Sequence, residues 1–200
     1  HVAMFESAFA AYCGVGHCVG VASGLDALPL ARVCAGVEHD DEVIVPAMTA
    51  AFTALAVTSI GARPTIVDVD PSRMTMDPRA AEAAVTPRTR AIVPVHLYGQ
   101  PADLDAIETL ATRHALAVVE DCCQAHLATC EGRPVGSDGA AAAYSFYPTK
   151  NLGALGDGGA LTMRDAALLA RAKRLRNGGQ TDKYRHDEFG VNSRLDEIQA

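Results

Sequence analysis

The sequence lacks the long apolar run that a membrane-spanning helix requires, because no hydrophobic stretch reaches roughly 18 residues. It also lacks a basic segment followed by an apolar core near its start, which is the pattern of a secretory signal. The chain begins with His1 rather than Met, so we expect that a leader or a longer N-terminus is missing. These features predict a cytoplasmic protein that does not act at a membrane.

Positive charge is scarce as well. The 17 Lys and Arg residues are outnumbered by 24 Asp and Glu residues, which gives a formal net charge of −7. Proteins that bind nucleic acid or anionic lipid usually present a basic surface, so this balance argues against both kinds of partner. With 200 residues, of which 49% are hydrophobic and 20% charged, the chain has the composition of a soluble domain with one substantial core.

Paired metal-binding cysteines are absent too. No two cysteines form a CxxC pair, and no combination of Cys and His has the spacing of a zinc site. Isolated cysteines in a reducing compartment usually behave as small buried hydrophobic residues. We therefore predict no metal and a set of mostly buried free thiols: Cys13, Cys18, Cys34, Cys122, Cys123 and Cys130.

Short apolar strands alternate with helical segments along the chain. This alternation is typical of an α/β fold, in which helices cover both faces of a mostly parallel sheet. The segment 177–192 is polar and is predicted to be an excursion outside the core. The predicted strands are 17–22, 42–45, 63–69, 91–95, 117–121, one that opens at 144, and 160–163. The predicted helices are 5–12, 25–35, 49–60, 77–84, 103–114, 165–175 and the start of another at 194–200.

The segment from Tyr144 to Ala160 carries the first chemical signal. A strand breaks at Pro148, Lys150 follows in a turn, and a glycine-rich run comes next. Glycines let a flat ligand approach the backbone closely. A lysine that loses hydration there is deprotonated more easily and becomes nucleophilic toward an aldehyde. Taken alone, the same stretch is equally compatible with a solvated lysine in a surface loop.

Other polar residues stand at the carboxyl ends of predicted strands, which is where ligands bind in open α/β sheets. The Ser23-Gly24 turn joins a strand to a helix and offers free backbone N–H groups to a phosphate, although many α/β turns look similar. Asp121 ends the strand 117–121, and Gln124 lies one turn further on.

These positions match the functional groups of pyridoxal phosphate. Ser145 and Lys150 are close in sequence, so one loop can reach the phosphate arm and the neighbouring aldehyde. Asp121, at another strand end, can keep the pyridine nitrogen protonated and so strengthen the electron sink. Each residue also has an ordinary structural role open to it: Asp121 as a helix cap, Ser145 as an edge-strand hydroxyl and Gln124 as a surface amide.

Seven stretches of the chain, in order, resemble the DegT/DnrJ/EryC/StrS family of sugar aminotransferases, pyridoxal-phosphate enzymes of fold type I. The stretches SFYPTKNLG and VHLYGQPAD look most like the branch that acts on nucleotide-linked keto-sugars. The resemblance implies that residues 1–200 form the cofactor-binding large domain. The seven stretches are VASGLDAL, DEVIVPAMT, GARPTIVDVDP, VHLYGQPADLDAI, VVEDCCQAH, YSFYPTKNLGALGDGGA and GVNSRLDEIQA.

The resemblance also implies residue roles. Lys150 forms the internal aldimine, Asp121 pairs with the pyridine nitrogen, and Gln124 lies against the ring. Ser145 and the Ser23-Gly24 turn hold the phosphate.

Further roles implied by the resemblance concern a second subunit and the substrate. Asn192 reaches the phosphate of the partner subunit's cofactor, which requires a homodimer with shared active sites. Tyr184 and His186 contact the sugar or the nucleotide.

Three departures from the family pattern are visible. Leu25 replaces the usual Thr, so only its backbone N–H can contact the phosphate. Ala50 replaces an aromatic residue that stacks on the ring, which leaves Phe52 as the nearest aromatic side chain. Third, the resemblance leads us to expect that the family's small C-terminal domain is missing from this chain after Ala200.

The predicted reaction moves an amino group from Glu or Gln to a keto-sugar, with Lys150 as the proton shuttle. Two alternatives stay open. A sugar dehydratase of the same fold often has His at the lysine position, and Lys150 argues against it. A non-catalytic regulatory or scaffold member is the other, and the pair Asp121 and Lys150 argues against that.

Overall fold

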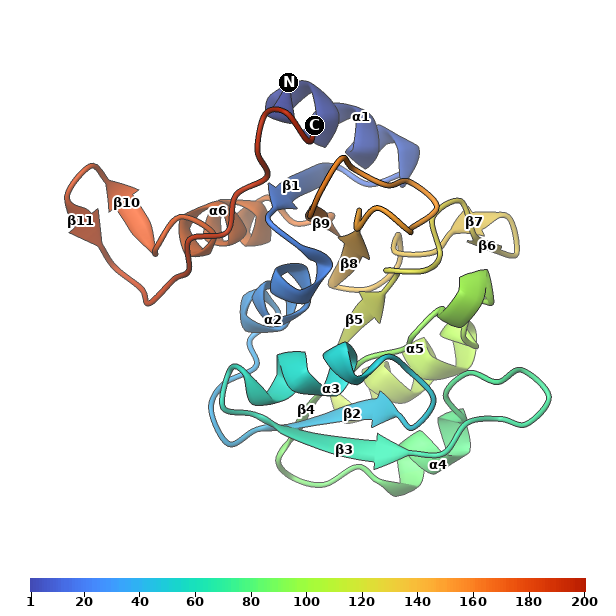
Figure 1. The fold of residues 1–200 in the computed structure, drawn as a ribbon. Helices are drawn as coiled ribbons and strands as arrows, with labels where there is room; N and C mark the ends of the chain where they lie inside the picture. The colour runs from blue at the N-terminus through green and yellow to red at the C-terminus, as the bar shows by residue number, and fades with distance from the viewer.

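The computed structural model describes residues 1–200, and a seven-stranded sheet forms its centre (Figure 1). Two short hairpins, β6 with β7 and β10 with β11, lie outside this sheet. The strands are β1 (His17–Val21), β2 (Glu42–Pro46), β3 (Arg63–Val67), β4 (Thr89–Ile92), β5 (Ala117–Asp121), β6 (Thr129–Cys130), β7 (Arg133–Pro134), β8 (Ala141–Ser145), β9 (Gly159–Met163), β10 (Gln180–Asp182) and β11 (Arg185–His186).

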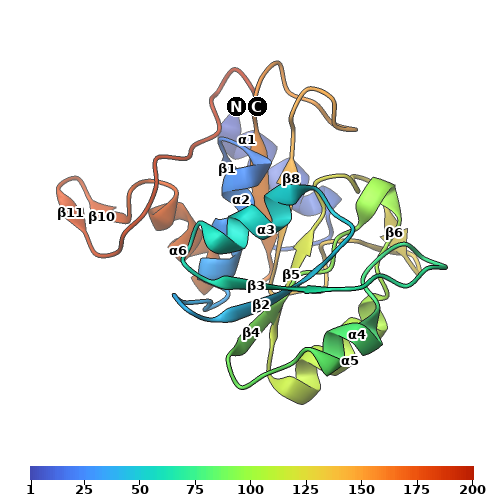
Figure 2. The same ribbon diagram turned by 60° about the horizontal axis from the view of Figure 1, so that its bottom comes forward.

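Helices cover both faces of the sheet, as predicted. Along β2, Val43 and Val45 pack into the core cluster shared with α2, α3 and α6, whereas Ile44 packs into the cluster shared with α4 and α5. Figure 2 shows α3 on one side of β2 and β3, and α4 and α5 on the other. The helices are α1 (Val2–Tyr12), α2 (Gly24–Cys34), α3 (Ala51–Thr58), α4 (Pro78–Ala83), α5 (Leu104–His114) and α6 (Ala166–Leu175), with a 3-10 turn, η1 (Leu97–Gly99).

Strand direction brings distant parts of the chain to one edge. The sheet order is β1-β9-β8-β5-β4-β2-β3, and only β9 runs against its neighbours. Since β9 is antiparallel to both β1 and β8, those two strands are parallel to each other, and β8 is parallel to β5. The carboxyl ends of β1, β5 and β8 therefore share one edge, where ligands bind in sheets of this kind.

The predicted strand that opens at 144 begins earlier, at Ala141. The alanines that precede Tyr144 look like low-complexity sequence, but in the structure they are buried β8 residues. Their small side chains belong to the clusters that pack against α2 and α1. Sequence composition alone did not reveal this, because alanine has a weak preference for strands.

Of the helix start predicted at 194–200, the structure shows a single turn, closed by the N–H groups of Gln199 and Ala200 on the Asp196 carbonyl. Leu195 is buried and packs beside Gly20 and Gly158. This packing fixes the path of the chain just before the turn.

The six cysteines are free thiols, four of them buried. No helix of the structure combines the length and the apolar character needed to cross a membrane.

The fold predicts unequal effects for two leucine truncations. Leu161 in β9 is completely buried in the largest core cluster, whereas the side chain of Leu155 is 87% exposed. Leu161→Ala should lower the free energy of unfolding by about 2–5 kcal/mol, because it removes buried methyl groups and leaves a cavity. Leu155→Ala is the matched control and should change it by less than about 0.5 kcal/mol. Denaturant unfolding of both variants measures this, and similar losses would contradict the described core.

Candidate active site

A cavity of about 550 Å³ lies at the shared carboxyl edge of β1, β5 and β8. Pockets of this size are typical of sites for small ligands and cofactors. The structure brings eight of the predicted cofactor-binding residues to its wall, and their individual roles stay predictions. They are Ser23, Gly24, Leu25, Phe52, Asp121, Gln124, Ser145 and Lys150.

One end of the cavity is a cradle of hydrogen-bond donors. Ser23 caps α2, and its hydroxyl accepts a hydrogen bond from the Asp26 N–H at 3.1 Å. The N–H groups of Gly24 and Leu25 follow in the first turn of the helix, where no intrahelical acceptor exists. Ser145 lies so close that a Cβ on Gly24 would stand 2.5 Å from the Ser145 Cβ. Only glycine permits this approach, which places a hydroxyl beside free backbone N–H groups, as a phosphate requires.

A carboxylate stands at another part of the cavity wall. Asp121 ends β5 and is 5% exposed. Its Oδ2 accepts a hydrogen bond from the Thr53 hydroxyl at 2.8 Å, and its Oδ1 accepts one from the Cys123 N–H at 3.1 Å. Two fixed donors therefore orient the carboxylate.

The sequence reading missed Thr53. Its hydroxyl lies 2.7 Å from that of Thr49, one helical turn earlier, and both residues line the cavity. Two threonines four residues apart on one helix share a face, so their spacing was a usable signal. Nothing in the sequence showed that this face would turn toward Asp121, since the two elements are far apart along the chain.

The lysine loop is held by backbone contacts. The Lys150 N–H donates to the Tyr147 carbonyl at 2.8 Å, and the Ala154 N–H donates to the Phe146 carbonyl at 2.8 Å. A Cβ on Gly153 would stand 2.7 Å from the Pro148 carbonyl oxygen, so the loop closes on itself only with glycine there. These contacts hold the loop in a shape that places the half-buried Lys150 at the cavity.

Lys150 is the only lysine at the cavity. The chain has two others, Lys173 on α6 and Lys183 at the projecting hairpin, and neither lines it. Burial lowers the pKa of His126, and the positive charge of the nearby Lys150 also acts to lower it. His126 is therefore neutral near neutral pH and adds no second cation to this loop.

Gln124 and Phe52 complete the wall. The Gln124 side-chain oxygen accepts a hydrogen bond from the Tyr98 N–H at 3.1 Å, which holds the amide at the cavity rim. Phe52 is 56% exposed and borders the cavity without filling it.

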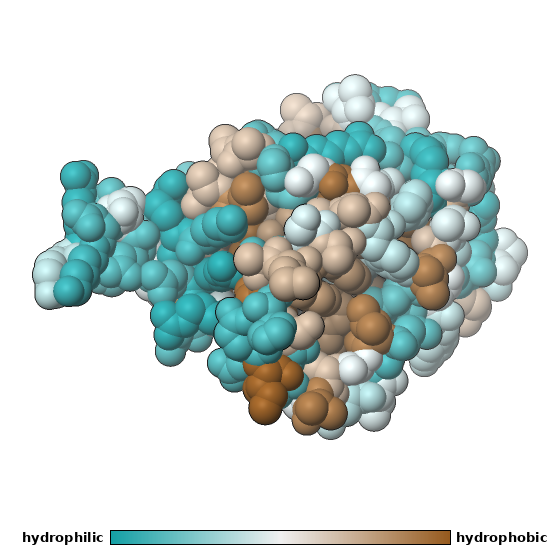
Figure 3. Space-filling view, turned by 90° about the horizontal axis from the view of Figure 1, so that it is seen from above, coloured by the Kyte–Doolittle hydropathy of each residue, from teal (hydrophilic) through white to brown (hydrophobic).

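Three predicted residues lie away from the cavity. Tyr184 and His186 belong to the β10–β11 hairpin, which projects from the body of the molecule in Figures 1 and 2. Asn192 is exposed and bridges to Asn177. In Figure 3 the projecting hairpin is largely hydrophilic, while apolar residues gather on the adjoining face of the body. Within one chain, then, these three residues do not contribute to the cavity.

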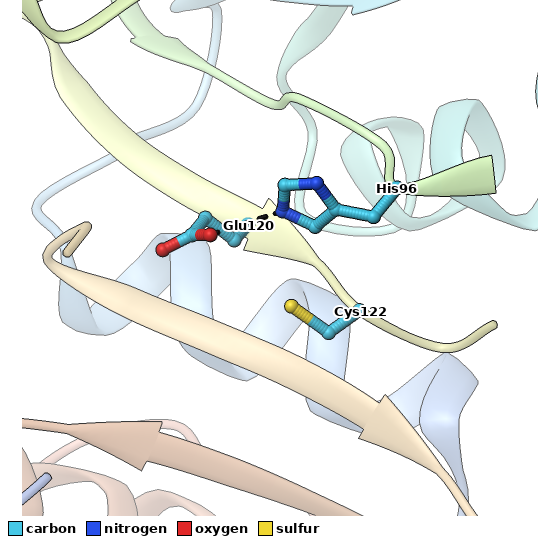
Figure 4. Close-up of side chains that lie close together, drawn as sticks. All are labelled: His96, Glu120 and Cys122. Atoms are coloured by element: carbon cyan, nitrogen blue, oxygen red, sulfur yellow. Dashed lines mark hydrogen bonds and ion pairs between the residues drawn. The ribbon is translucent and has the colours of Figure 1, made fainter. Parts of the chain in front are cut away.

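A separate buried cluster of His96, Glu120 and Cys122 has the composition of a metal site (Figure 4). The His96 Nδ1 accepts a hydrogen bond from the Ala102 N–H at 3.1 Å, so its proton is on Nε2, which donates to Glu120 at 3.0 Å. Burial raises the pKa of the Cys122 thiol well above its usual value, so the thiol is protonated. No imidazole nitrogen is free to bind a metal, and the cluster is instead a hydrogen-bonded structural pair beside a thiol.

Glu120 also connects β5 to the following loop, because its carboxylate accepts hydrogen bonds from the N–H groups of Gly136 at 2.7 Å and Gly139 at 3.0 Å. Burial acts to raise the pKa of Glu120, but the bonds from His96 and the two glycines outweigh it and hold the pKa below its ordinary value. A carboxyl whose pKa is lowered by folding adds stability above its unfolded pKa, and this stability is lost as the pH falls through the folded value.

Glu120→Gln should therefore lower the free energy of unfolding by about 2 kcal/mol near neutral pH, because a charged acceptor of three hydrogen bonds becomes a neutral one. The difference from the unsubstituted protein should shrink as the pH falls below about 4.5, where the unfolded chain's carboxyl is protonated, and should be lost once the pH falls through the lower pKa of the folded protein. Denaturant unfolding over a pH series measures it, with the exposed Glu131→Gln as control. A difference that does not change with pH would contradict this assignment.

The fold and the cavity define the class of protein: an α/β domain with a lysine, a carboxylate and an anion cradle at one sheet edge. The model of the DegT/DnrJ/EryC1/StrS aminotransferase family matches residues 1–200. The chain belongs to this family. Its fold is that of the pyridoxal-phosphate-dependent transferases of fold type I, which confirms the predicted fold class.

Two curated relatives show how this chain is placed within the family. It is 55% identical over 196 residues to the erythromycin biosynthesis sensory transduction protein EryC1 of Saccharopolyspora erythraea, covering 98% of this chain and 54% of that protein. It is 53% identical to the dTDP-3-amino-3,4,6-trideoxy-alpha-D-glucose transaminase of Streptomyces venezuelae, covering 98% of this chain and 52% of that protein. The chain thus spans about half the length of these relatives.

Two solved structures are similar over nearly the whole chain. DesV of S. venezuelae, in complex with a ketimine intermediate, superimposes with a TM-score of 0.96 at 52% identity, covering 99% of this chain and 53% of that one. NtdA of Bacillus subtilis, with bound cofactor PMP, superimposes with a TM-score of 0.92 at 33% identity, covering 99% and 45%.

Proposed function

We propose that this chain is the cofactor-binding part of an aminotransferase that moves an amino group from glutamate or glutamine to a keto-sugar, in particular a nucleotide-linked keto-hexose. The observation that carries the proposal is that Lys150, Asp121 and the Gly24–Ser145 cradle all line one cavity. These groups come from three separate strand ends. Together they offer an amine, an acid and an anion site at the same place.

The residues present fit pyridoxal phosphate. The cradle of Gly24, Leu25 and Ser145 offers two backbone N–H groups and a hydroxyl to the phosphate. Asp121 offers an anion to the ring nitrogen, and Lys150 is the amine that would hold the aldehyde. When bound, the cofactor supplies an electron sink that stabilises negative charge on the substrate carbon.

The chain's own residues would supply positioning and proton transfer. Lys150 Nζ, once unprotonated, accepts the proton that leaves the amino donor and later returns one to the product. The loop bonds around Tyr147 and Gly153 keep that amine at the cavity rather than in solvent. Thr53 and the Cys123 N–H keep the Asp121 carboxylate in a fixed direction, so no reorganisation is needed when charge develops.

Relatives support the substrate class. The S. venezuelae relative is named for a dTDP-linked amino sugar, and it shares about half its length with this chain. The EryC1 relative is described as a sensory transduction protein, which keeps a regulatory role as the second candidate. Lys150 at the cavity favours catalysis over regulation, and it argues against a dehydratase with His at this position.

Lys150→Ala tests the proposal. In the full-length protein that contains these residues, this variant should lose borohydride-stable attachment of pyridoxal phosphate and lose amino transfer, because the cavity has no second amine. Lys150→Arg should also fail, since a guanidinium stays protonated. The exposed Lys173→Ala is the control and should behave like the unsubstituted protein. Mass spectrometry locates the attachment, and a panel of nucleotide-linked keto-sugars reports the transfer.

A cofactor that remains covalently attached in Lys150→Ala would refute the assignment of the amine. An unsubstituted protein that binds no pyridoxal phosphate would favour the regulatory candidate.

The proposal includes a homodimer with shared active sites. Asn192, Tyr184 and His186 are all exposed and lie outside their own chain's cavity. If Asn192 contacts a cofactor phosphate, and Tyr184 and His186 contact the sugar or nucleotide, a second copy of the chain must present them. Such an interface would use the same surface patch on both copies, as two-fold dimers do.

A shared site predicts complementation between two inactive or impaired variants. When Lys150→Ala chains are mixed with Asn192→Ala chains, each heterodimer carries one site with both defects and one with neither. Activity should then return in up to roughly half of the sites of a fully heterodimeric population. Co-expression with two different affinity tags isolates the heterodimer for assay. If isolated heterodimers show no recovery, Asn192 acts within its own chain or not at all.

A further inference from the structure

Arg32 in α2 is the largest fully buried side chain of the structure, with an exposed fraction of 0%. Its Nη2 donates a hydrogen bond to the Thr53 carbonyl oxygen at 3.2 Å, but its Nε and Nη1 have no partner. A guanidinium is always charged in proteins and carries five N–H donors. A buried cation with so few hydrogen bonds is costly unless an anion lies nearby.

Asp121 supplies that anion. Burial lowers the pKa of Arg32 to about 10, and the charges that act against this effect come first from Asp121 and then from Cys123. Burial raises the pKa of the Cys123 thiol well above its usual value, so near neutral pH this thiol is uncharged. The carboxylate of Asp121 is therefore the charge that compensates Arg32.

Thr53 joins the two groups. Its backbone carbonyl accepts from Arg32, and its hydroxyl donates to the Asp121 Oδ2 at 2.8 Å. Alternation along β5 explains why Asp121 comes close to Arg32 and Thr53. Asp121 follows Val119 by two residues, so both side chains point to the same face of the sheet, and Val119 packs there into the cluster that α2 and α3 share. Arg32 is not among the residues that line the cavity, whereas Thr53 and Asp121 are, so Arg32 contacts the cavity wall without reaching the cavity itself.

We propose that Arg32 is a positioning residue for Asp121: through Thr53 and through its charge, it keeps the carboxylate correctly directed at the cavity. The partner of that carboxylate, the ring nitrogen of pyridoxal phosphate, rests on the proposed function. The coupling between Arg32 and Asp121 does not, because it is a property of the protein without cofactor.

A double-substitution cycle on the cofactor-free protein tests the coupling. Arg32→Met removes the charge but keeps most of the volume, and Asp121→Asn removes the opposite charge. Thermal unfolding is measured for the unsubstituted protein, both single variants and the double variant. Arg32→Met should lower the melting temperature by at least about 4 °C more in the unsubstituted background than in the Asp121→Asn background. In the unsubstituted background the substitution leaves a buried carboxylate without its compensating cation, whereas in the Asp121→Asn background no such anion is present.

Two further variants keep the cycle interpretable. Arg32→Lys retains a positive charge and should recover part of the loss, even if Arg32→Met folds poorly. Arg79→Met is the matched control, since its side chain is 90% exposed, and it should show no coupling to Asp121→Asn. Equal losses for Arg32→Met in both backgrounds would mean that Arg32 only fills space, and the inference would be overturned.

Cofactor binding provides the second measurement. Titration with pyridoxal phosphate, followed by absorbance, should give an affinity at least about tenfold lower for Arg32→Met, while Arg32→Lys should lose less. An affinity unchanged by Arg32→Met but reduced by Asp121→Asn would overturn the positioning role. If the unsubstituted protein binds no cofactor, the proposed function fails, and the cycle still decides whether the charge coupling exists.

Discussion

The direction of β8 is the constraint on which the site depends. This strand runs parallel to β5 and antiparallel to β9, and β9 in turn runs antiparallel to β1. Reversing or shifting β8 would separate the Ser145–Lys150 loop from the Asp121 end of β5 and from the Gly24 turn after β1. The alanines of β8 make the arrangement possible, because their small side chains let α2 approach until Gly24 touches Ser145. A parallel sheet thus converts three distant sequence segments into one cavity wall.

The two adjacent acidic residues of β5, Glu120 and Asp121, have different roles because their side chains point to opposite faces of the sheet. Glu120 faces the side of the sheet occupied by His96 and the 136–139 loop, where it accepts hydrogen bonds and fixes local structure. Asp121 faces the opposite side, toward α2 and α3, where Thr53 orients it at the cavity. Because successive side chains of a strand point to opposite faces, adjacent carboxylates have unlike surroundings. The buried polar network on one face thereby supports the strand end that carries the chemistry on the other.

Much of the fold could be predicted from local sequence. The alternation of strands and helices, the Ser23-Gly24 turn before α2 and the helices predicted at 103–114 and 165–175 all depend on residues near one another in the chain. Errors arose where packing overrides local preference. The path of the chain at Leu195 is set by its packing against Gly20 and Gly158, and the start of β8 is set by contacts between alanines and helices. Neither kind of contact leaves a periodic signal.

The sequence by itself determined which groups are available for chemistry: a lysine in a glycine-rich loop, an acid at a strand end, and a serine-glycine turn before a helix. Their residue types and their places at strand ends are local properties. Only the tertiary structure decided that these groups meet, that Thr53 links Arg32 to Asp121, and that Asn192, Tyr184 and His186 lie outside the cavity of their own chain. The physical reason is that hydrogen bonds and charge pairs between distant segments depend on how sheet and helices pack, and packing is a property of the whole chain.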